Sequence, residues 1–399
     1  MFSLDRFYNI LHTNLLGQFP SGRCINFYPF GTYESIQVQT SIRAVFRPDM
    51  AFAKKTYFDC YFFDQEPFYQ ETQLILEKVL QPESRFIRPN NVQILAVSEH
   101  SDIVNIKNFY TWYYFFHGFA ALDWYRDFQY FEPHVFNKFD KVFICYNHLI
   151  SNLRSYRLHL GSNIISQNLA KHGRFSLFLK DYHGTWKQSV TDPDNPLTSQ
   201  ARKKIYQVLK DVHEPFIIDT SSPKGALSAT INFQDSVNSF FHVVTETVYF
   251  SPKLHLTEKI FKPIVCKRPF ILVAAPGNLN YLKSYGFQTF DRWIDESYDQ
   301  ETDHYARIEK ITAEIARLCA MSPSKLHQIH REMQHTLEYN FDHFYSNFRY
   351  KIIDELVDNF DLILQKINYG KISNNHSRYH VRYELSQDYL NQVRQRLKQ

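Results

Sequence analysis

The stretch TETVYFSPKLHLTEKIFKPIVCKRPFILVAAPG, residues Thr245–Gly277, decides how the rest of the chain is interpreted. Thr257 precedes a charged pair and an apolar segment, which indicates a helix that begins with Thr257 as its N-cap. The run FILVAA at Phe270–Ala275 is apolar at every position, as in a parallel-sheet strand that is buried on both faces. The stretch therefore predicts a loop, a helix, a buried strand and a tight turn at Pro276-Gly277.

The start of this predicted helix has side chains that suit a nucleotide. Glu258 can accept hydrogen bonds from a ribose diol, and Lys259 can pair with a phosphate. Backbone N–H groups and the positive end of the helix dipole also favour an anion there. Lys262, about one turn further on, is a candidate to assist Lys259. The alternative for Glu258 is an ordinary capping carboxylate.

Glu246, followed by Thr257-Glu258-Lys259, a helix and a Pro-Phe-Ile strand, resembles the donor-binding signature of fucosyltransferase-type (family 10-like) GT-B glycosyltransferases. The resemblance covers Ser239–Ser297, and it is closest to uncharacterised phage- and giant-virus-type relatives of that family. The chain differs from the family pattern at His255-Leu256, where the family has Tyr-Val. The resemblance implies a nucleotide-sugar donor that is bound by Glu246, Thr257, Glu258 and Lys259, and a GT-B fold.

Strand-like runs alternate with helical patterns in both halves of the chain, which predicts the α/β class with parallel sheets. Together with the resemblance, this alternation predicts two Rossmann-like domains that face each other across a cleft, with C-terminal helices. The expected domains are residues 1–140 on the acceptor side, residues 141–368 for the nucleotide sugar, and a tail or helix at 369–399. The strand-like runs that support this are Cys24–Phe30, Tyr57–Phe63, Val92–Val97, Lys141–Tyr146 and Ser239–Val244.

Acidic residues follow two strands of the first predicted domain, at the sheet edge where open α/β sheets bind ligands. Glu66 comes directly after a strand and before Pro67, so it is the first candidate for the base that deprotonates the acceptor hydroxyl. Asp64 and Glu99 are the alternatives. His117 lies in the aromatic stretch Asn108–Asp127, which is interpreted either as a buried wall or as part of the cleft.

The strand at Lys141–Tyr146 leads into a segment with groups that suit a diphosphate. Asn147 follows the strand, and Arg154 and Arg157 are three residues apart, so they can share a helix face. The resemblance implies that an arginine in this region holds the donor diphosphate, and arginine suits bidentate phosphate contact. A solvated helix face is the alternative for either arginine.

The sequence gives no indication of a disulfide-rich, zinc-binding or membrane-spanning protein. The 399 residues carry a net charge of +4 and five widely spaced cysteines, so neither a disulfide framework nor a zinc site is indicated. Asp192-Pro193-Asp194 has the form of a metal-diphosphate motif but lies in a proline-rich loop, so we expect neither a metal nor a cofactor. No signal peptide or membrane span is recognised, so a cytoplasmic protein is expected, in the host cytoplasm if the source is viral.

The sequence is compatible with two kinds of acceptor and with one non-enzymatic role. The first acceptor is a soluble or lipid-linked glycan. The second is phage DNA with hydroxymethylated pyrimidines, for which the chain offers Arg202-Lys203-Lys204, the basic residues Arg394, Arg396 and Lys398, and many aromatic side chains. A chain that keeps the GT-B shell without catalysis is the third possibility.

Overall fold

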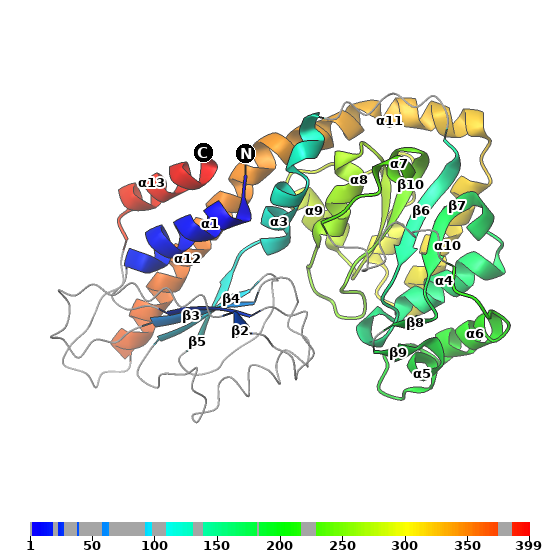
Figure 1. Ribbon diagram of the computed structural model, residues 1–399, viewed down its shortest axis with the longest axis horizontal. Coiled ribbons are helices and arrows are strands. Elements are labelled where there is room, and N and C mark those ends of the chain that lie inside the picture. The colour runs from blue at the N-terminus through cyan, green and yellow to red at the C-terminus, as the bar shows by residue number, and fades with distance from the viewer. Residues whose placement is uncertain are drawn as a thin grey trace. The chain divides into compact units, whose positions relative to one another are not determined.

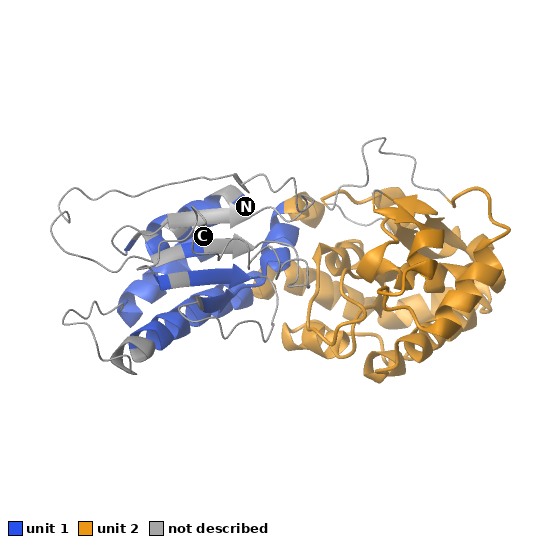
Figure 2. Cartoon of the chain, turned by 90° about the horizontal axis from the view of Figure 1, so that it is seen from below, with its two compact units in different colours: residues 1–123, 349–399 blue, residues 124–348 orange. Residues whose placement is uncertain are grey.

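The computed structural model describes residues 2–18, 23–27, 38–39, 58–63, 92–97, 109–130, 139–181, 183–216, 229–373 and 385–399. The chain divides into two compact units (Figure 2). Unit 1 contains Met1–Asp123 together with Arg349–Gln399, and unit 2 contains Trp124–Phe348. The domain ranges expected from the sequence, 1–140, 141–368 and 369–399, stay predictions about independently folding domains.

Unit 1 is built on a five-stranded sheet in the order β2-β1-β3-β4-β5. Four of these strands are parallel, and β2 pairs antiparallel with β1 at one edge. In β4, the side chains of Ile94, Leu95 and Ala96 are all buried, as expected for a strand that is covered on both faces. The strands are β1 (Arg23–Phe27), β2 (Val38–Gln39), β3 (Phe58–Phe63), β4 (Val92–Val97) and β5 (Phe109–Tyr113).

Helices from both ends of the chain complete unit 1 (Figure 1). Trp112 on β5 donates a hydrogen bond of 3.1 Å from its indole N–H to the Leu356 carbonyl, and its ring lies 4.8 Å from that of Phe360. Phe7 and Phe119 stack at 4.3 Å, so the first helix also joins this aromatic core. The helices are α1 (Leu4–Ile10), η1 (Leu11–Leu15), η2 (Leu16–Gln18), α3 (Phe116–Trp124), α12 (Arg349–Ser373) and α13 (Gln387–Lys398).

Unit 2 is built on a four-stranded parallel sheet in the order β11-β10-β6-β7. All seven residues of β10 are buried, because this strand lies between two parallel neighbours. The strands are β6 (Lys141–Asn147), β7 (Gly173–Leu177), β10 (Ser239–Thr245) and β11 (Phe270–Val273). Parallel sheets with many helices confirm the α/β class that the sequence predicts.

Helices and short hairpin strands surround this second sheet (Figure 1). Ser322 caps α11 and Pro323 is its first residue, a position where the missing N–H of proline has no partner to lose. The elements of unit 2 outside the sheet are η4 (Arg126–Tyr130), η5 (Asn152–Arg154), α4 (Tyr156–Ser166), η6 (Ala170–His172), β8 (Lys180–Asp181), β9 (Gly184–Thr185), α5 (Trp186–Thr191), α6 (Ser199–Leu209), α7 (Phe233–Val237), η7 (Glu258–Ile260), α8 (Phe261–Val265), α9 (Asn278–Ser284), η8 (Ser297–Gln300), α10 (His304–Cys319), α11 (Pro323–His343) and η9 (Phe344–Phe348).

Candidate functional site

A cluster of buried polar side chains lies where β10 ends. Glu246 follows the last residue of this strand, and its N–H donates to the carbonyl of Val273 on β11 at 3.0 Å. From there the chain makes a loop and returns to the same place at Thr257, which caps η7 through its hydroxyl. The segment that the sequence singles out is thus folded back on itself at the carboxyl edge of the sheet, the edge where α/β proteins bind ligands.

Glu246 and Thr257 close this loop. The N–H of Thr257 donates to Oε1 of Glu246 at 3.1 Å, and its hydroxyl donates to Oε2. The Glu246 side chain is fully buried, at 0% exposure. Burial raises the pKa of Glu246, while the nearby Lys259 ammonium and the hydrogen bonds from Thr257 oppose this. Because both carboxylate oxygens hold Thr257, Glu246 fixes the start of η7.

Glu258 and Lys259 come directly after this cap. The Lys259 ammonium lies 3.0 Å from the Thr257 hydroxyl and 3.3 Å from Oε1 of Glu258. The Glu258 side chain is buried, whereas the Lys259 side chain is 32% exposed. Lys259 is therefore the most exposed group of the cluster, and any anion that contacts its ammonium group has to compete with Glu258.

Arg157 is buried and connects this cluster to the preceding part of unit 2. Its Nη2 donates to the carbonyls of Thr245 and Glu246 at 3.0 and 3.3 Å, and its Nη1 donates to the carbonyl of Leu149 at 3.0 Å. The hydroxyl of the neighbouring Tyr156 donates to the same Glu246 carbonyl. These contacts give Arg157 a scaffold role, and its expected contact with a diphosphate stays a prediction.

The other expected donor-binding residues are spread over three elements of unit 2. Asn147 is fully buried at the end of β6, where its Nδ2 donates to Sγ of Cys145 at 3.2 Å. Its Oδ1 is buried and has no hydrogen-bond partner among the described residues. Arg154 is half-buried in η5. Lys262 on α8 donates to the carbonyl of Thr230 at 2.9 Å. The structure thus brings Asn147 and Glu246 to the ends of adjacent strands.

Of the four expected catalytic residues, only His117 lies within the residues that the structure describes. Glu66, Asp64 and Glu99 lie outside the residues that the structure describes, so their role as a base stays a prediction. His117 is buried in α3 of unit 1, with its ring 5.4 Å from that of Phe116 in an edge-to-face arrangement.

Tyr125 is a buried residue whose electrostatic interaction with the cluster was not indicated by the sequence. Burial raises its pKa well above the ordinary value of 10.0, and the negative charges of Glu258 and Glu246 raise it further. Its phenol therefore lies within electrostatic range of both carboxylates. The sequence offers no local signal for this, because Tyr125 is one of many aromatic residues in Asn108–Asp127 and lies more than a hundred positions from Glu246.

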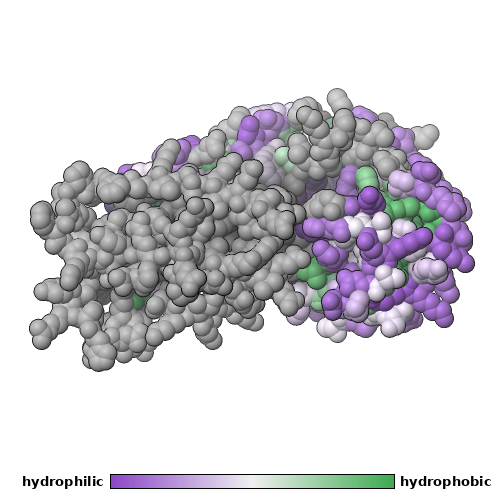
Figure 3. Space-filling view, turned by 60° about the horizontal axis from the view of Figure 1, so that its bottom comes forward, coloured by the Kyte–Doolittle hydropathy of each residue, from purple (hydrophilic) through white to green (hydrophobic). Residues whose placement is uncertain are grey.

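Four of the six basic residues that could contact DNA have protein partners, namely Arg202, Lys204, Arg394 and Lys398. Arg202 donates to the carbonyls of Val190 and Asp192, both at 2.6 Å, and Lys204 pairs with Glu309 at 2.9 Å. On α13 in unit 1, Lys398 and Arg394 pair with acidic residues of α12, namely Asp354 and Asp358. The part of unit 2 that is visible in Figure 3 is mainly hydrophilic, with small apolar patches. These pairs leave less positive charge for phosphates than the sequence suggests.

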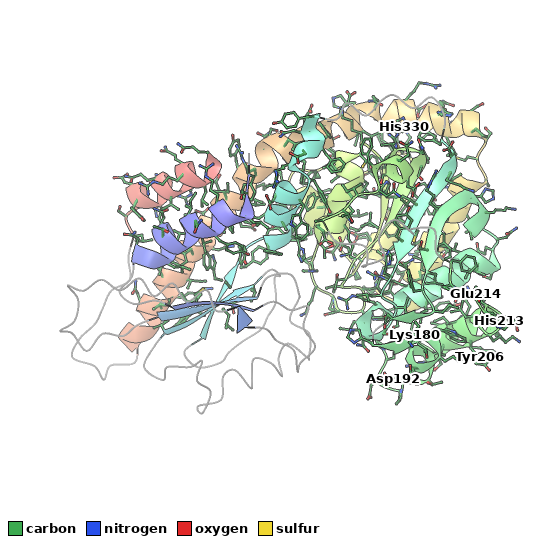
Figure 4. The ribbon with its side chains drawn as sticks, in the orientation of Figure 1. Lys180, Asp192, Tyr206, His213, Glu214 and His330 are labelled. Carbon is green, nitrogen blue, oxygen red and sulfur yellow. The ribbon has the colours of Figure 1, made fainter. Side chains whose placement is uncertain are left out.

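The Asp192-Pro193-Asp194 segment forms a turn that is closed by a hydrogen bond to the Asp192 side chain. Its Oδ1 accepts a hydrogen bond of 2.9 Å from the Asp194 N–H. Figure 4 shows Asp192 in the part of unit 2 that contains α5 and α6, where Lys180 and Tyr206 are also labelled. Among the described residues, no group of three or more histidine, cysteine, aspartate or glutamate side chains could hold a metal ion.

The fold and the cluster define an α/β protein with buried carboxylates and one accessible lysine at the carboxyl edge of a parallel sheet. Comparisons with models of protein families, with curated proteins and with solved structures find no match. Within the described ranges, none of the helices is long and apolar enough to cross a membrane.

Proposed function

We propose that this protein is a glycosyltransferase that moves a sugar from a nucleotide-sugar donor to a hydroxyl group, and that unit 2 binds the donor. The observation that carries the proposal is the cluster of Glu246, Thr257, Glu258 and Lys259 at the carboxyl edge of the parallel sheet. A second, GT-B-like domain that faces the donor and carries the acceptor is part of the same proposal.

The chemistry of the cluster supports a nucleotide. We propose that the buried carboxylate of Glu258 accepts hydrogen bonds from the two hydroxyls of a ribose, and that its pairing with Lys259 orients both groups. The ammonium of Lys259 is exposed enough to contact a phosphate, while Glu246 holds Thr257 through a hydrogen bond. Preorganised groups of this kind bind a ligand without first having to be ordered.

Glycosyl transfer needs a leaving group whose charge is neutralised and a base for the acceptor hydroxyl. We propose that Lys259 and the half-buried Arg154 neutralise the departing diphosphate, so that the reaction requires no bound metal. Glu66 is the proposed base, with Asp64 and Glu99 as alternatives. Exclusion of water from the site would prevent hydrolysis of the donor.

A glycan is the proposed acceptor in preference to hydroxymethylated DNA. DNA binding depends on cationic side chains that neutralise phosphates. Lys204, Arg394 and Lys398 pair with carboxylates instead, and Arg202 is occupied by backbone carbonyls. Cationic side chains that are paired within the protein do not neutralise the phosphates of a DNA duplex.

The test combines binding and hydrolysis. The wild-type protein is screened by calorimetry against GDP, UDP and dTDP, and by product release against GDP-, UDP-, dTDP- and CMP-sugars. Glu258→Ala is expected to abolish sugar release and to weaken binding of the preferred diphosphate at least tenfold. Glu338→Ala, which removes an exposed carboxylate on α11, is the matched control and should bind as the wild type does.

The outcomes separate the three candidate roles. Binding without turnover of any sugar nucleotide would favour a non-catalytic binding module. Transfer of the sugar only to hydroxymethylcytosine DNA would mean that the acceptor is DNA and not a glycan. Unchanged diphosphate affinity in Glu258→Ala would remove the assignment of the site.

A further inference from the structure

The segment between β6 and α4, residues 148–155, is held in an unusual conformation. It follows β6 at the carboxyl edge of the sheet and contains η5 with Arg154. Asn152 at the start of η5 has a φ angle of 53°, in the left-handed region that residues other than glycine rarely adopt. A backbone conformation of this kind persists only where the surrounding contacts determine it.

Asp181 on β8 supplies the first set of these contacts. Its Oδ2 accepts from the N–H groups of Ile150 and Ser151 at 2.8 and 2.9 Å. Its Oδ1 accepts from the Ser151 hydroxyl at 2.8 Å, from the His183 N–H at 2.9 Å and from the Gly184 N–H at 3.2 Å. A carboxylate with five donors has little capacity left for a ligand, so Asp181 acts through the segment that it holds.

The charge of Asp181 is stable under ordinary conditions. Partial burial alone would raise the pKa of its carboxyl group. The hydrogen bonds from Ile150, Ser151 and His183 outweigh burial, so the pKa lies below its ordinary value of 3.8. Asp181 is therefore ionised at neutral pH, where it accepts every one of these hydrogen bonds.

Asn195 holds the other end of the segment. Its Oδ1 accepts from the Ser155 hydroxyl at 2.8 Å, and its Nδ2 lies 3.5 Å from the Asn152 carbonyl. Arg202 fixes the turn that carries Asn195, through the carbonyls of Val190 and Asp192. Arg202 thus holds the turn of the Asp-Pro-Asp motif, and Asn195 in this turn contacts residues 148–155. Asp192 and Lys180, which precedes Asp181, lie in the same corner of unit 2 (Figure 4).

The braced segment is also joined to the proposed donor site. Arg157 donates to the carbonyl of Leu149 in this segment and to the carbonyls of Thr245 and Glu246 at the end of β10. One buried guanidinium therefore fixes the distance between the two loops at the sheet edge. The segment carries Arg154, the half-buried cation nearest in sequence to this link.

We propose that Asp181 is a positioning residue that holds residues 148–155 in the conformation that presents Arg154 to the diphosphate of the donor. This inference rests on the proposed function, and it adds a residue that the sequence did not indicate. Preorganisation of the segment means that the diphosphate does not have to order it on binding. Loss of the Asp181 carboxylate is expected to weaken binding of the diphosphate without removing any group that touches it.

The test uses the full chain and a graded set of variants. Asp181→Ala removes all five hydrogen bonds, Asp181→Asn keeps one acceptor oxygen, and Ser151→Ala removes only the hydroxyl contact. Asp211→Ala, which removes an aspartate that is 81% exposed beyond α6, is the matched control. Hydrogen exchange of the peptide that covers residues 148–155 and calorimetry with GDP, UDP and dTDP are measured for each protein.

The expected order of both effects is Asp211→Ala, Ser151→Ala, Asp181→Asn and Asp181→Ala, from none to the largest. Asp181→Ala should speed exchange of residues 148–155 at least tenfold and weaken binding of the preferred diphosphate about tenfold. Ser151→Ala removes only one hydrogen bond, so we expect it to fold even if Asp181→Ala does not. Relative to the wild type, Ser151→Ala should show a small increase in exchange and a small loss of affinity. Asp181→Asn should recover part of the affinity lost in Asp181→Ala, which a merely structural role would not require.

Two results overturn the inference while leaving the proposed function in place. One is unchanged exchange in residues 148–155 of Asp181→Ala, and the other is faster exchange with unchanged diphosphate affinity. If the wild-type protein binds none of the three diphosphates, the proposed function fails, and the inference fails with it.

Discussion

Two loops at the same sheet edge are each closed by one carboxylate, in opposite ways. Glu246 closes residues 246–257 with two hydrogen bonds from a single residue and is fully buried. Asp181 closes residues 148–155 with five hydrogen bonds and is only partly buried. Burial raises the pKa of Glu246, whereas hydrogen bonds lower that of Asp181 against the effect of burial. The number of donors and the depth of burial together decide which form of a carboxyl group the fold prefers.

Removal of the buried carboxylate should have the largest effect on stability. Glu246→Ala leaves the N–H and the hydroxyl of Thr257 buried without their partner, which costs about 1–3 kcal/mol for each group. We expect the free energy of unfolding to fall by roughly 2–6 kcal/mol, measured by chemical denaturation, and diphosphate binding to be lost. Thr257→Ser keeps the hydroxyl and is the control, with an expected loss of about 0.8 kcal/mol for one methyl group. A stability of Glu246→Ala equal to the wild type would show that Glu246 does not support the loop.

The two carboxylates should respond to acid with opposite signs. The pKa of Asp181 lies below 3.8 in the folded protein, so its contribution to stability is present above this pH and is lost as the pH falls through the folded value. The pKa of Glu246 lies above 4.5, so its contribution is present below pH 4.5 and is lost as the pH rises through the folded value.

Glu246→Gln and Asp181→Asn provide the measurement. Free energies of unfolding are compared with the wild type between pH 3 and pH 7. The destabilisation caused by Asp181→Asn should shrink toward acid, and that caused by Glu246→Gln should grow. A single group changes the free energy by at most about 1.4 kcal/mol per pH unit, and solvent screening makes the change smaller for Asp181. Slopes of the same sign in both variants would contradict the opposite pKa shifts.

The sequence predicts those parts of the fold that depend on local patterns. The apolar runs that become β6, β10 and β11 are continuous, and the caps at Thr257 and Ser322 depend on one side chain and its next few residues. These signals lie within a short window of residues, so a single sequence contains them in full.

The sequence does not predict which residues, far apart in the chain, form hydrogen bonds with the buried polar side chains. Asp181 holds residues that are 30 and 31 positions away, and Arg157 spends its donors on carbonyls 88 and 89 positions away. Trp112 and Leu356, which join β5 to α12 in unit 1, are 244 positions apart. No periodicity connects such pairs, so the sequence alone does not show that Arg157 binds the carbonyls of Thr245 and Glu246.

The smallest effects are expected far from both loops, on α13 of unit 1. Lys398 and Arg394 pair with Asp354 and Asp358 at a partly exposed surface, where such pairs contribute about 0–1 kcal/mol. Arg394→Gln should therefore change the free energy of unfolding by less than about 1 kcal/mol. Because the guanidinium is already paired, we also expect the salt dependence of binding to hydroxymethylcytosine duplex DNA to be unchanged by Arg394→Gln. The measurement is the slope of log affinity against log salt concentration, with Lys203→Gln on α6 as a comparison. A decrease in the slope by about one unit in Arg394→Gln would mean that this arginine leaves its carboxylates for a phosphate, and it would favour DNA over a glycan as the acceptor.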